Sequence, residues 1–306
     1  MSTPHVVIGA GPVGHTVTDQ LVEAGHPVRL ITRSGSGPVH PLVERRAVDA
    51  RDEAALRGAV EGAPAVFHCA HAAYSAKTWS EELPRTEQTV LTAAAGSVVV
   101  FPESLYAYGD PADVMTEDSP RDATGGKRAI RVRLLAARAA STTPTVSIVA
   151  SDFFGPYARN AQAGERMLPR IIAGKRVRVV GSADEPHSFT YVGDYARAMV
   201  AAAGRRDVWG RVLHAPTGPA LTQRALVQAF AAAAGTNVEV STFPAVVLRL
   251  GALAPGILRE LAETIYQLQA PFVMSSTATE ALLGLSPTPV EVAARETVAW
   301  WRQQAG

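Results

Sequence analysis

The sequence predicts an α/β fold in which a Rossmann-type, doubly wound parallel sheet carries a smaller C-terminal substrate lobe. Three observations support this. Short β-rich runs alternate with helical patterns through the first half of the chain, which is typical of βαβ units. Three glycines follow the first run, and the second half is less regular. We therefore expect a dinucleotide-binding Rossmann domain over residues 1–155 and a smaller, partly interleaved substrate-binding lobe over 156–306.

The expected elements follow the apolar runs in chain order. Strands are predicted at 5–10, 27–32, 65–70, 97–101 and 145–150, and helices between them at 12–24, 53–60, 81–95 and 126–142. In the second half, strands are predicted at 176–181 and 212–216, and helices at 192–203, 222–235, 256–269 and 289–303. We expect this second half to cover the C-terminal edge of the sheet.

Composition narrows the class of protein. With 306 residues, of which 47% are hydrophobic and 19% charged, the chain can bury a substantial core. Its formal net charge of +1 favours neither nucleic acid nor an anionic membrane, so we expect a small-molecule substrate as partner. The single cysteine excludes an internal disulfide and a Cys-x-x-Cys metal site. Without a basic leader or a long apolar segment, a cytoplasmic protein is expected.

A Gly-x-Gly-x-x-Gly pattern lies between the first predicted strand and the helix after it. Gly9 can make the tight turn, Gly11 lets the backbone approach a pyrophosphate, and Gly14 lets helix and strand pack closely. Pro12 and Val13 stand at the helix N-terminus, over which phosphates bind. A glycine-rich turn without a ligand is the alternative, but the βαβ context favours dinucleotide binding.

The end of the second predicted strand indicates which dinucleotide binds. An NAD site usually carries Asp or Glu there to hold the ribose 2′-hydroxyl, whereas this chain reads "ITRSGSG". Arg33 and Ser34 offer a guanidinium and a hydroxyl, which suit a 2′-phosphate. We therefore predict NADP as the cofactor, with NAD less favoured. The alternative is that Arg33 is a solvated surface residue.

Five further segments follow the glycine loop in a characteristic order: "AVDARD", "AVFHCAHAAY", "ESLYAYGD", "SDFFGP" and "FTYVGDYARAMVAAA". With them the chain resembles, over nearly its whole length, the extended short-chain dehydrogenase/reductase superfamily in its NAD-dependent epimerase/dehydratase branch. The resemblance implies that Asp49, with Ala50 beside it, holds the adenine amino group. It also implies that Cys69, Ala70 and His71 lie along the cofactor.

The segment "ESLYAYGD" carries hydroxyls at alternate positions, which an extended chain would direct to one face. The resemblance places the family's catalytic serine on Ser104, a substrate-facing position on Tyr106 and a structural tyrosine on Tyr108. We therefore expect Ser104 to take part in catalysis.

The family's Tyr-x-x-x-Lys motif is missing from the next predicted helix, which reads "TGGKRAIRVRLLAARAA". Counting back from "LLAAR" puts the Lys position on Arg133 and the Tyr position on Ala129. Because a positioned general acid or base contributes roughly 10²- to 10⁴-fold in rate, a substitute is needed, and Tyr106 is the nearest candidate. Arg133 cannot act as a base near neutrality, but it could supply the positive charge. The other cations of this helix are expected on a half-solvated face: Lys127, Arg131 and Arg138.

Other candidates are weaker. His71 could contact substrate, as could Tyr157 and Asn160, although a turn at Gly155-Pro156 explains that segment without them. His68 and His71 flank Cys69, but no carboxylate pattern completes a metal site, so no metal is expected.

These observations predict an NADP-dependent oxidoreductase or epimerase that acts on a carbonyl or secondary alcohol of a small biosynthetic substrate. A non-redox cyclase, isomerase or dehydratase on the same fold stays open, and loss of the tyrosine favours it. A non-catalytic NADP-sensing protein is the third alternative. The resemblance also implies a homodimer formed through a four-helix bundle that would include residues 81–95 and 126–142.

Overall fold

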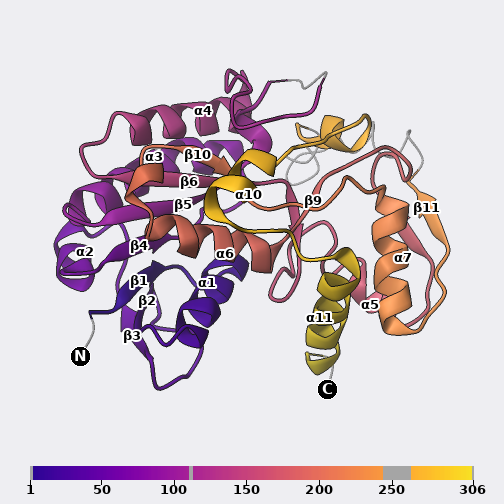
Figure 1. Ribbon diagram of the computed structural model, residues 1–306, viewed down its shortest axis with the longest axis horizontal. Coiled ribbons are helices and arrows are strands. Elements are labelled where there is room, and N and C mark those ends of the chain that lie inside the picture. The colour runs from indigo at the N-terminus through magenta and orange to yellow at the C-terminus, as the bar shows by residue number, and fades with distance from the viewer. Residues whose placement is uncertain (1–2, 110–112, 244–262, 305–306) are drawn as a thin grey trace.

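The computed structural model describes residues 3–109, 113–243 and 263–304, and its centre is a parallel sheet (Figure 1). The strands are β1 (His5–Ile8), β2 (Val28–Thr32), β3 (Val43–Ala47), β4 (Ala65–His68), β5 (Val98–Ser104), β6 (Thr145–Ala150) and β10 (Val212–His214). They are ordered β10-β6-β5-β4-β1-β2-β3, and every neighbouring pair is parallel. The strand order reverses between β1 and β4, which is where doubly wound sheets bind ligands. The predicted fold class is confirmed.

Helices cover both faces of this sheet (Figure 1). Helices α1 (Pro12–Glu23) and α6 (Val192–Ala203) pack on one face, and α2 (Glu53–Val60), α3 (Ala76–Ala93) and α4 (Gly126–Ala139) lie over the other. Alternate strand residues explain the two layers, because Val7 packs towards α1 and α6 while Val6 and Ile8 pack towards α2 and α3. Strands buried on both faces account for the valine-rich runs of the sequence.

The rest of the chain forms smaller units beyond the carboxyl edge of the sheet. Two short parallel pairs are β7 (Asp152–Phe154) with β9 (Phe189–Tyr191), and β8 (Val177–Val179) with β11 (Val240–Thr242). The helices here are α5 (Leu168–Ile172), α7 (Gln223–Ala234) and α11 (Val290–Gln303), while α10 (Thr277–Leu283) packs beside α6 and β10. The short 3₁₀ turns η1 (Leu105–Ala107) and η3 (Ile265–Leu268) also lie on this side, whereas η2 (Arg206–Val208) precedes β10 at the amino edge of the sheet.

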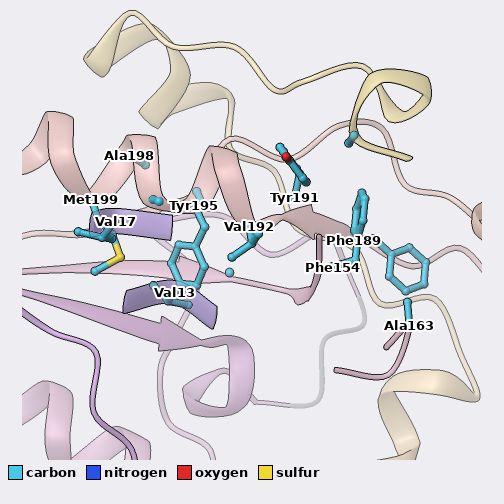
Figure 2. Close-up of a cluster of buried hydrophobic side chains, with 14 of the residues drawn as sticks. Val13, Val17, Phe154, Ala163, Phe189, Tyr191, Val192, Tyr195, Ala198 and Met199 are labelled. Atoms are coloured by element: carbon cyan, nitrogen blue, oxygen red, sulfur yellow. The ribbon is translucent and has the colours of Figure 1, made fainter. Parts of the chain in front are cut away.

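One hydrophobic cluster joins the sheet to these smaller units. Figure 2 shows Val13 and Val17 of α1 beside Tyr195 and Met199 of α6, with Phe154 and the β9 residues further along the same cluster. The cluster continues into α7 and α11. Both α6 and β10 belong to the layers around the main sheet although they follow residue 156. The expected boundary between 155 and 156 stays a prediction about folding units.

Several elements differ from the sequence-based prediction. Strand β3 was not expected because "VERRA" is polar, and it forms an edge strand with four exposed residues. Helix α3 begins at Ala76 rather than 81, since the Ser75 hydroxyl accepts a hydrogen bond from the Thr78 amide at 3.5 Å. Half of the expected helix at 256–269 lies outside the described residues, and its described half contains η3 instead of an α-helix. None of the helices in the described ranges combines the length and apolar character needed to span a bilayer.

Candidate cofactor and substrate site

A pocket of about 1970 Å³ runs along the carboxyl edge of the sheet. It is lined by residues that follow β1, β2, β4, β5 and β6, together with residues of the second half of the chain. Drug-sized ligands occupy roughly 300–1,000 Å³, so this pocket has room for a dinucleotide and a second molecule. Most of the predicted site residues line it: Gly9, Gly11, Pro12, Val13, Arg33, Ser34, Asp49, Ala50, Cys69, Ala70, His71, Ser104, Tyr106, Tyr157 and Asn160.

The three glycine positions of the loop differ in their steric surroundings. Gly9 has φ +99°, and a Cβ there would lie 2.6 Å from the backbone nitrogen of Ala70. A Cβ on Gly14 would lie 2.0 Å from the carbonyl oxygen of Gly9, so Gly14 packs helix against loop rather than lining the pocket. Gly11, by contrast, has open space around it and lines the pocket as the N-cap of α1. A helix N-terminus that lines a pocket in this way suits a pyrophosphate.

The end of β2 and the loop after β3 form one end of the pocket. Asp49 accepts hydrogen bonds from the Arg51 amide at 3.0 Å and from its Nη2 at 2.7 Å, which lowers the pKa of Asp49 to about 2. Ser34 donates to Ser36 at 2.8 Å. Arg33 is exposed to the pocket, and among the described residues no side chain forms a hydrogen bond or an ion pair with it.

Helix α4 presents Arg131, and not Arg133, to the pocket. Arg133 is exposed and does not line the pocket, so the structure corrects its predicted placement. Two residues along an α-helix amount to a rotation of about 200°, which explains why the count from "LLAAR" selected the opposite face. The solvated face expected for the neighbouring cations is also wrong, because Lys127, Arg131 and Arg138 are 0%, 6% and 3% exposed.

A buried network of four charges holds Arg131 in place. Arg138 binds Glu87 with two hydrogen bonds of 2.8 and 2.6 Å, and it donates to Glu103 at 2.9 Å. The other Glu103 oxygen lies 3.3 Å from Arg131 Nε and accepts the Ser104 amide at 2.8 Å. Glu103 therefore connects the cation at the pocket wall to the backbone of the predicted catalytic serine. Glu87 and Glu103 were not predicted as site residues.

Arg131 in turn contacts His71. Its guanidinium lies 4.7 Å from the centre of the Trp79 ring and donates to His71 Nε2. His71 Nδ1 lies 2.8 Å from the Ala72 carbonyl, so the neutral tautomer with a proton on Nδ1 satisfies both contacts. Desolvation and the charge of Arg131 lower the pKa of His71 to about 4. His71 is therefore neutral at neutral pH.

The three hydroxyls of "ESLYAYGD" do not share one face. The 3₁₀ turn η1 interrupts the extended chain after Ser104, so Ser104 and Tyr106 line the pocket while Tyr108 turns away. Tyr108 is 1% exposed, and its hydroxyl lies 2.7 Å from His214 Nε2. The structure thus gives Tyr108 a packing position and leaves two hydroxyls for a ligand.

Tyr106 has a partner that the sequence did not reveal. Its hydroxyl is hydrogen-bonded to that of Tyr74 at 3.0 Å, and Lys127 Nζ lies 4.4 Å from the centre of the Tyr74 ring. Burial raises the pKa of Tyr106 well above its usual value, and Arg131 only partly opposes this. Near neutral pH Tyr106 is a hydrogen-bond donor and not a base.

The second half of the chain contributes Tyr157 and Asn160 to the pocket. Tyr157 has a left-handed backbone (φ +63°) and donates its hydroxyl to Asp19 of α1 at 3.0 Å. Its ring stacks on His15 of the same helix, 4.7 Å between centres. Tyr157 thus lies beside α1, the helix that follows the glycine loop. Asn160 is exposed at the pocket.

The end of β4 does not present reactive ionised groups. Burial raises the pKa of the Cys69 thiol, and it lowers the pKa of His68, which is 4% exposed, to about 4. In the part of the chain that the structure describes, no three His, Cys, Asp or Glu side chains are grouped so as to hold a metal ion.

The parallel sheet, the glycine loop and the helix that begins at Gly11 define a Rossmann-type dinucleotide-binding protein. A family model described as the NAD dependent epimerase/dehydratase family matches residues 5–212, which is more than half of the chain. The chain therefore belongs to this family and is an enzyme of the NAD-dependent oxidoreductase and epimerase type. The resemblance read from the sequence is confirmed. A search of curated protein sequences found no match.

Solved structures of the same fold cover nearly all of the chain. UDP-glucose 4-epimerase of Thermotoga maritima, solved with UDP-glucose, has a TM-score of 0.78 and 19% identity, covering 99% of this chain and 100% of its own. UDP-glucuronic acid 4-epimerase of Bacillus cereus, solved with NAD, has a TM-score of 0.76 and 16% identity, covering 98% and 97%. A dTDP-glucose 4,6-dehydratase of Streptomyces venezuelae, also solved with NAD, has a TM-score of 0.76 and 18% identity, covering 99% of this chain and 98% of its own. At these identities the likeness shows the fold.

Proposed function

We propose that this enzyme uses NADP to interconvert a secondary alcohol and a carbonyl in a small biosynthetic substrate, as an oxidoreductase or as an epimerase. One observation carries the proposal. A single pocket joins the glycine loop and Arg33 at one end to Ser104 and Tyr106 at the other. The cofactor and the hydroxyls that would face a reacting oxygen would therefore share one pocket.

The preference for NADP rests on Arg33. Its guanidinium has no competing ion pair with a described residue and lines the pocket beside Ser34. A charge-assisted hydrogen bond to a 2′-phosphate contributes roughly 1.5–3 kcal/mol. This corresponds to a preference for NADP over NAD on the order of tenfold to a hundredfold.

The nicotinamide, when bound, supplies the acceptor or donor of a hydride. The chain's own groups bind and orient the substrate. Ser104 and Tyr106 donate hydrogen bonds to the reacting oxygen, and Arg131 supplies positive charge at the pocket wall. Neutral His71, held by Arg131, borders the same space without titrating near neutral pH.

UDP-glucose and dTDP-glucose are the first substrates to test, because they are named with solved structures of this fold. Each offers secondary alcohols next to a bulky nucleotide, and the pocket is large enough for both cofactor and substrate. A cytoplasmic homodimer that packs through the outer sides of α3 and α4 is part of the same proposal.

The cofactor is tested by the dissociation constants of NADPH and NADH, measured by titration of the fluorescence of the reduced nicotinamide. NADPH should bind at least tenfold more tightly, and Arg33→Asp should erase or reverse that order. Arg176→Asp is the matched control, because Arg176 is half exposed, pairs with Glu239 and lies outside the pocket. Equal constants for the two nucleotides in the unmodified protein would contradict the assignment of NADP.

The reaction is tested by the absorbance band of the reduced nicotinamide in the presence of each sugar nucleotide. A net change identifies an oxidoreductase, and a transient change within one turnover identifies an epimerase. Product formed without either change would favour the non-redox alternative. Cofactor binding with no turnover of any carbonyl or alcohol would favour a sensor.

A further inference from the structure

A carboxylate lies next to the two pocket hydroxyls. Strand β6 ends at Ala150 directly opposite Ser104 of β5, and the chain continues through Ser151 to Asp152, both of which line the pocket. The Asp152 side chain is 32% exposed, and its charge contributes to raising the pKa of Tyr106. Ser151 is 6% exposed, and its Oγ has no hydrogen-bond partner among the described residues. This edge of the pocket is therefore polar, and its hydrogen-bonding groups are only partly bound by other groups of the protein.

A buried histidine holds this carboxylate. His187 is 2% exposed, and its Nε2 lies 3.1 Å from Asp152 Oδ2. Its Nδ1 lies 3.0 Å from the backbone carbonyl of Gln267. The ring is packed by Phe189 and Phe272, whose centres lie 4.6 and 5.4 Å away. Oδ1 of Asp152 has no hydrogen bond to a described residue, so one carboxylate oxygen is fixed and the other is left for a ligand.

The two contacts of His187 require an additional proton. A neutral imidazole has one donor and one acceptor nitrogen, yet both of its nitrogens face oxygens that accept hydrogen bonds. Both contacts are satisfied only when His187 is an imidazolium or when the Asp152 carboxyl is protonated. The pair therefore holds one exchangeable proton at the wall of the pocket.

The other ionisable groups around this part of the pocket are poor candidates for proton transfer. Tyr106 stays protonated because its pKa is raised, and His71 stays neutral because its pKa is lowered. Arg131 is permanently charged. Lys127 pairs with Glu263 at 3.2 Å and does not line the pocket. Asp152 shares an exchangeable proton with His187 and has access to the pocket.

We propose that Asp152 is the catalytic acid and base of this enzyme, and that His187 is a positioning residue that holds its carboxylate. This inference rests on the proposed function. During oxidation the substrate hydroxyl gives its proton to Oδ1 of the ionised Asp152 carboxylate, beside the His187 imidazolium, while the hydride on the same carbon passes to the oxidised nicotinamide, and a carbonyl forms. During reduction the carbonyl carbon receives a hydride and its oxygen takes the proton back from Asp152. Ser104 and Tyr106 donate hydrogen bonds to that oxygen in both directions.

The first test compares Asp152→Asn with Asp184→Asn, in which an equally sized change is made at an exposed carboxylate outside the pocket. Asp152→Asn should lower kcat for whichever of UDP-glucose and dTDP-glucose is converted by about 10²-fold or more, while the NADPH dissociation constant stays within twofold. Asp184→Asn should leave both unchanged. His187→Gln should lower kcat with little change in KM. Turnover by Asp152→Asn within threefold of the unmodified enzyme would overturn the proposal.

The second test needs no turnover and uses the full chain with NADPH and ¹⁵N-labelled histidine. The chain has eight histidines, and the signals of His187 are those lost in His187→Gln. Because Asp152 must be ionised to accept a proton during oxidation, we expect the resting pair to be a carboxylate and an imidazolium with one proton on each ring nitrogen of His187. Asp152→Asn should convert the ring to a neutral form protonated on one nitrogen. A ring with one protonated nitrogen that is unaffected by Asp152→Asn would refute the pair. If NADPH does not bind, the result counts against the proposed function. The ring signals of His187 then still show whether it forms the pair with Asp152.

Discussion

Replacing Glu103 by glutamine should destabilise the protein strongly, because it removes one charge from a buried set of four. Glu87, Glu103, Arg131 and Arg138 are all at most 6% exposed, and together their charges sum to zero. After Glu103→Gln the set carries an uncompensated positive charge. Arg138 keeps Glu87, whereas Arg131 loses its carboxylate at 3.3 Å.

The size of the effect follows from the cost of leaving a buried charge without its partner, which is about 3–5 kcal/mol. The glutamine oxygen can still accept the Ser104 amide, so we expect the lower end, a loss of about 3 kcal/mol in the free energy of unfolding. The measurement is the free energy of unfolding in urea, for the unmodified protein and for Glu103→Gln. Glu53→Gln is the control, because Glu53 and Arg57 form an exposed i,i+4 pair at 2.6 Å, worth about 0.3–0.5 kcal/mol. A loss below about 1 kcal/mol for Glu103→Gln would refute the reasoning.

Three other predictions follow from the site. Gly11→Val places a side chain in the space left for the pyrophosphate, so it should abolish NADPH binding in a fluorescence titration while thermal unfolding stays cooperative. Tyr106→Phe removes a donor to the reacting oxygen and should lower kcat about tenfold, whereas Tyr108→Phe breaks the contact with His214 and should chiefly lower the melting temperature. Similar kinetics of the two would mean that Tyr106 is a packing residue. Because burial lowers the pKa of His68 from 6.5 to about 4, the unfolded chain binds more protons between these values. Stability should therefore fall as pH falls from 6.5 towards 4, and urea midpoints of His68→Asn should depend less on pH in that window.

The position of the glycine loop at the pocket could be predicted from the sequence because its determinants are local. Gly9, Gly11 and Gly14 act within one βα turn, and their spacing carries the steric requirements that the structure shows. Arg33 follows the next strand by one residue, so its placement in the pocket also depends on local chain geometry.

The catalytic end was harder to predict because its geometry depends on distant contacts. Helical phase decided between Arg131 and Arg133, and an error of two residues selected the wrong face. Asp152 and His187 are 35 residues apart and meet only because β7 pairs with β9. No local pattern in the sequence marks such a pair. Buried ion pairs also allow α4 to bury Lys127, Arg131 and Arg138, which the helical periodicity of the sequence placed on a solvent-exposed face.

The position of β10 has a consequence for synthesis of the chain on the ribosome. β10 covers the side of β6 that faces away from β5, and all six residues of β6 are buried in the finished protein. Until residue 214 has been synthesised and has left the ribosome, β6 is therefore an apolar edge strand with unpaired backbone groups. Such edges pair with other chains. We expect nascent chains that stop between residues 150 and 212 to aggregate or to recruit chaperones. Chains that extend beyond β10 should be released from this hazard.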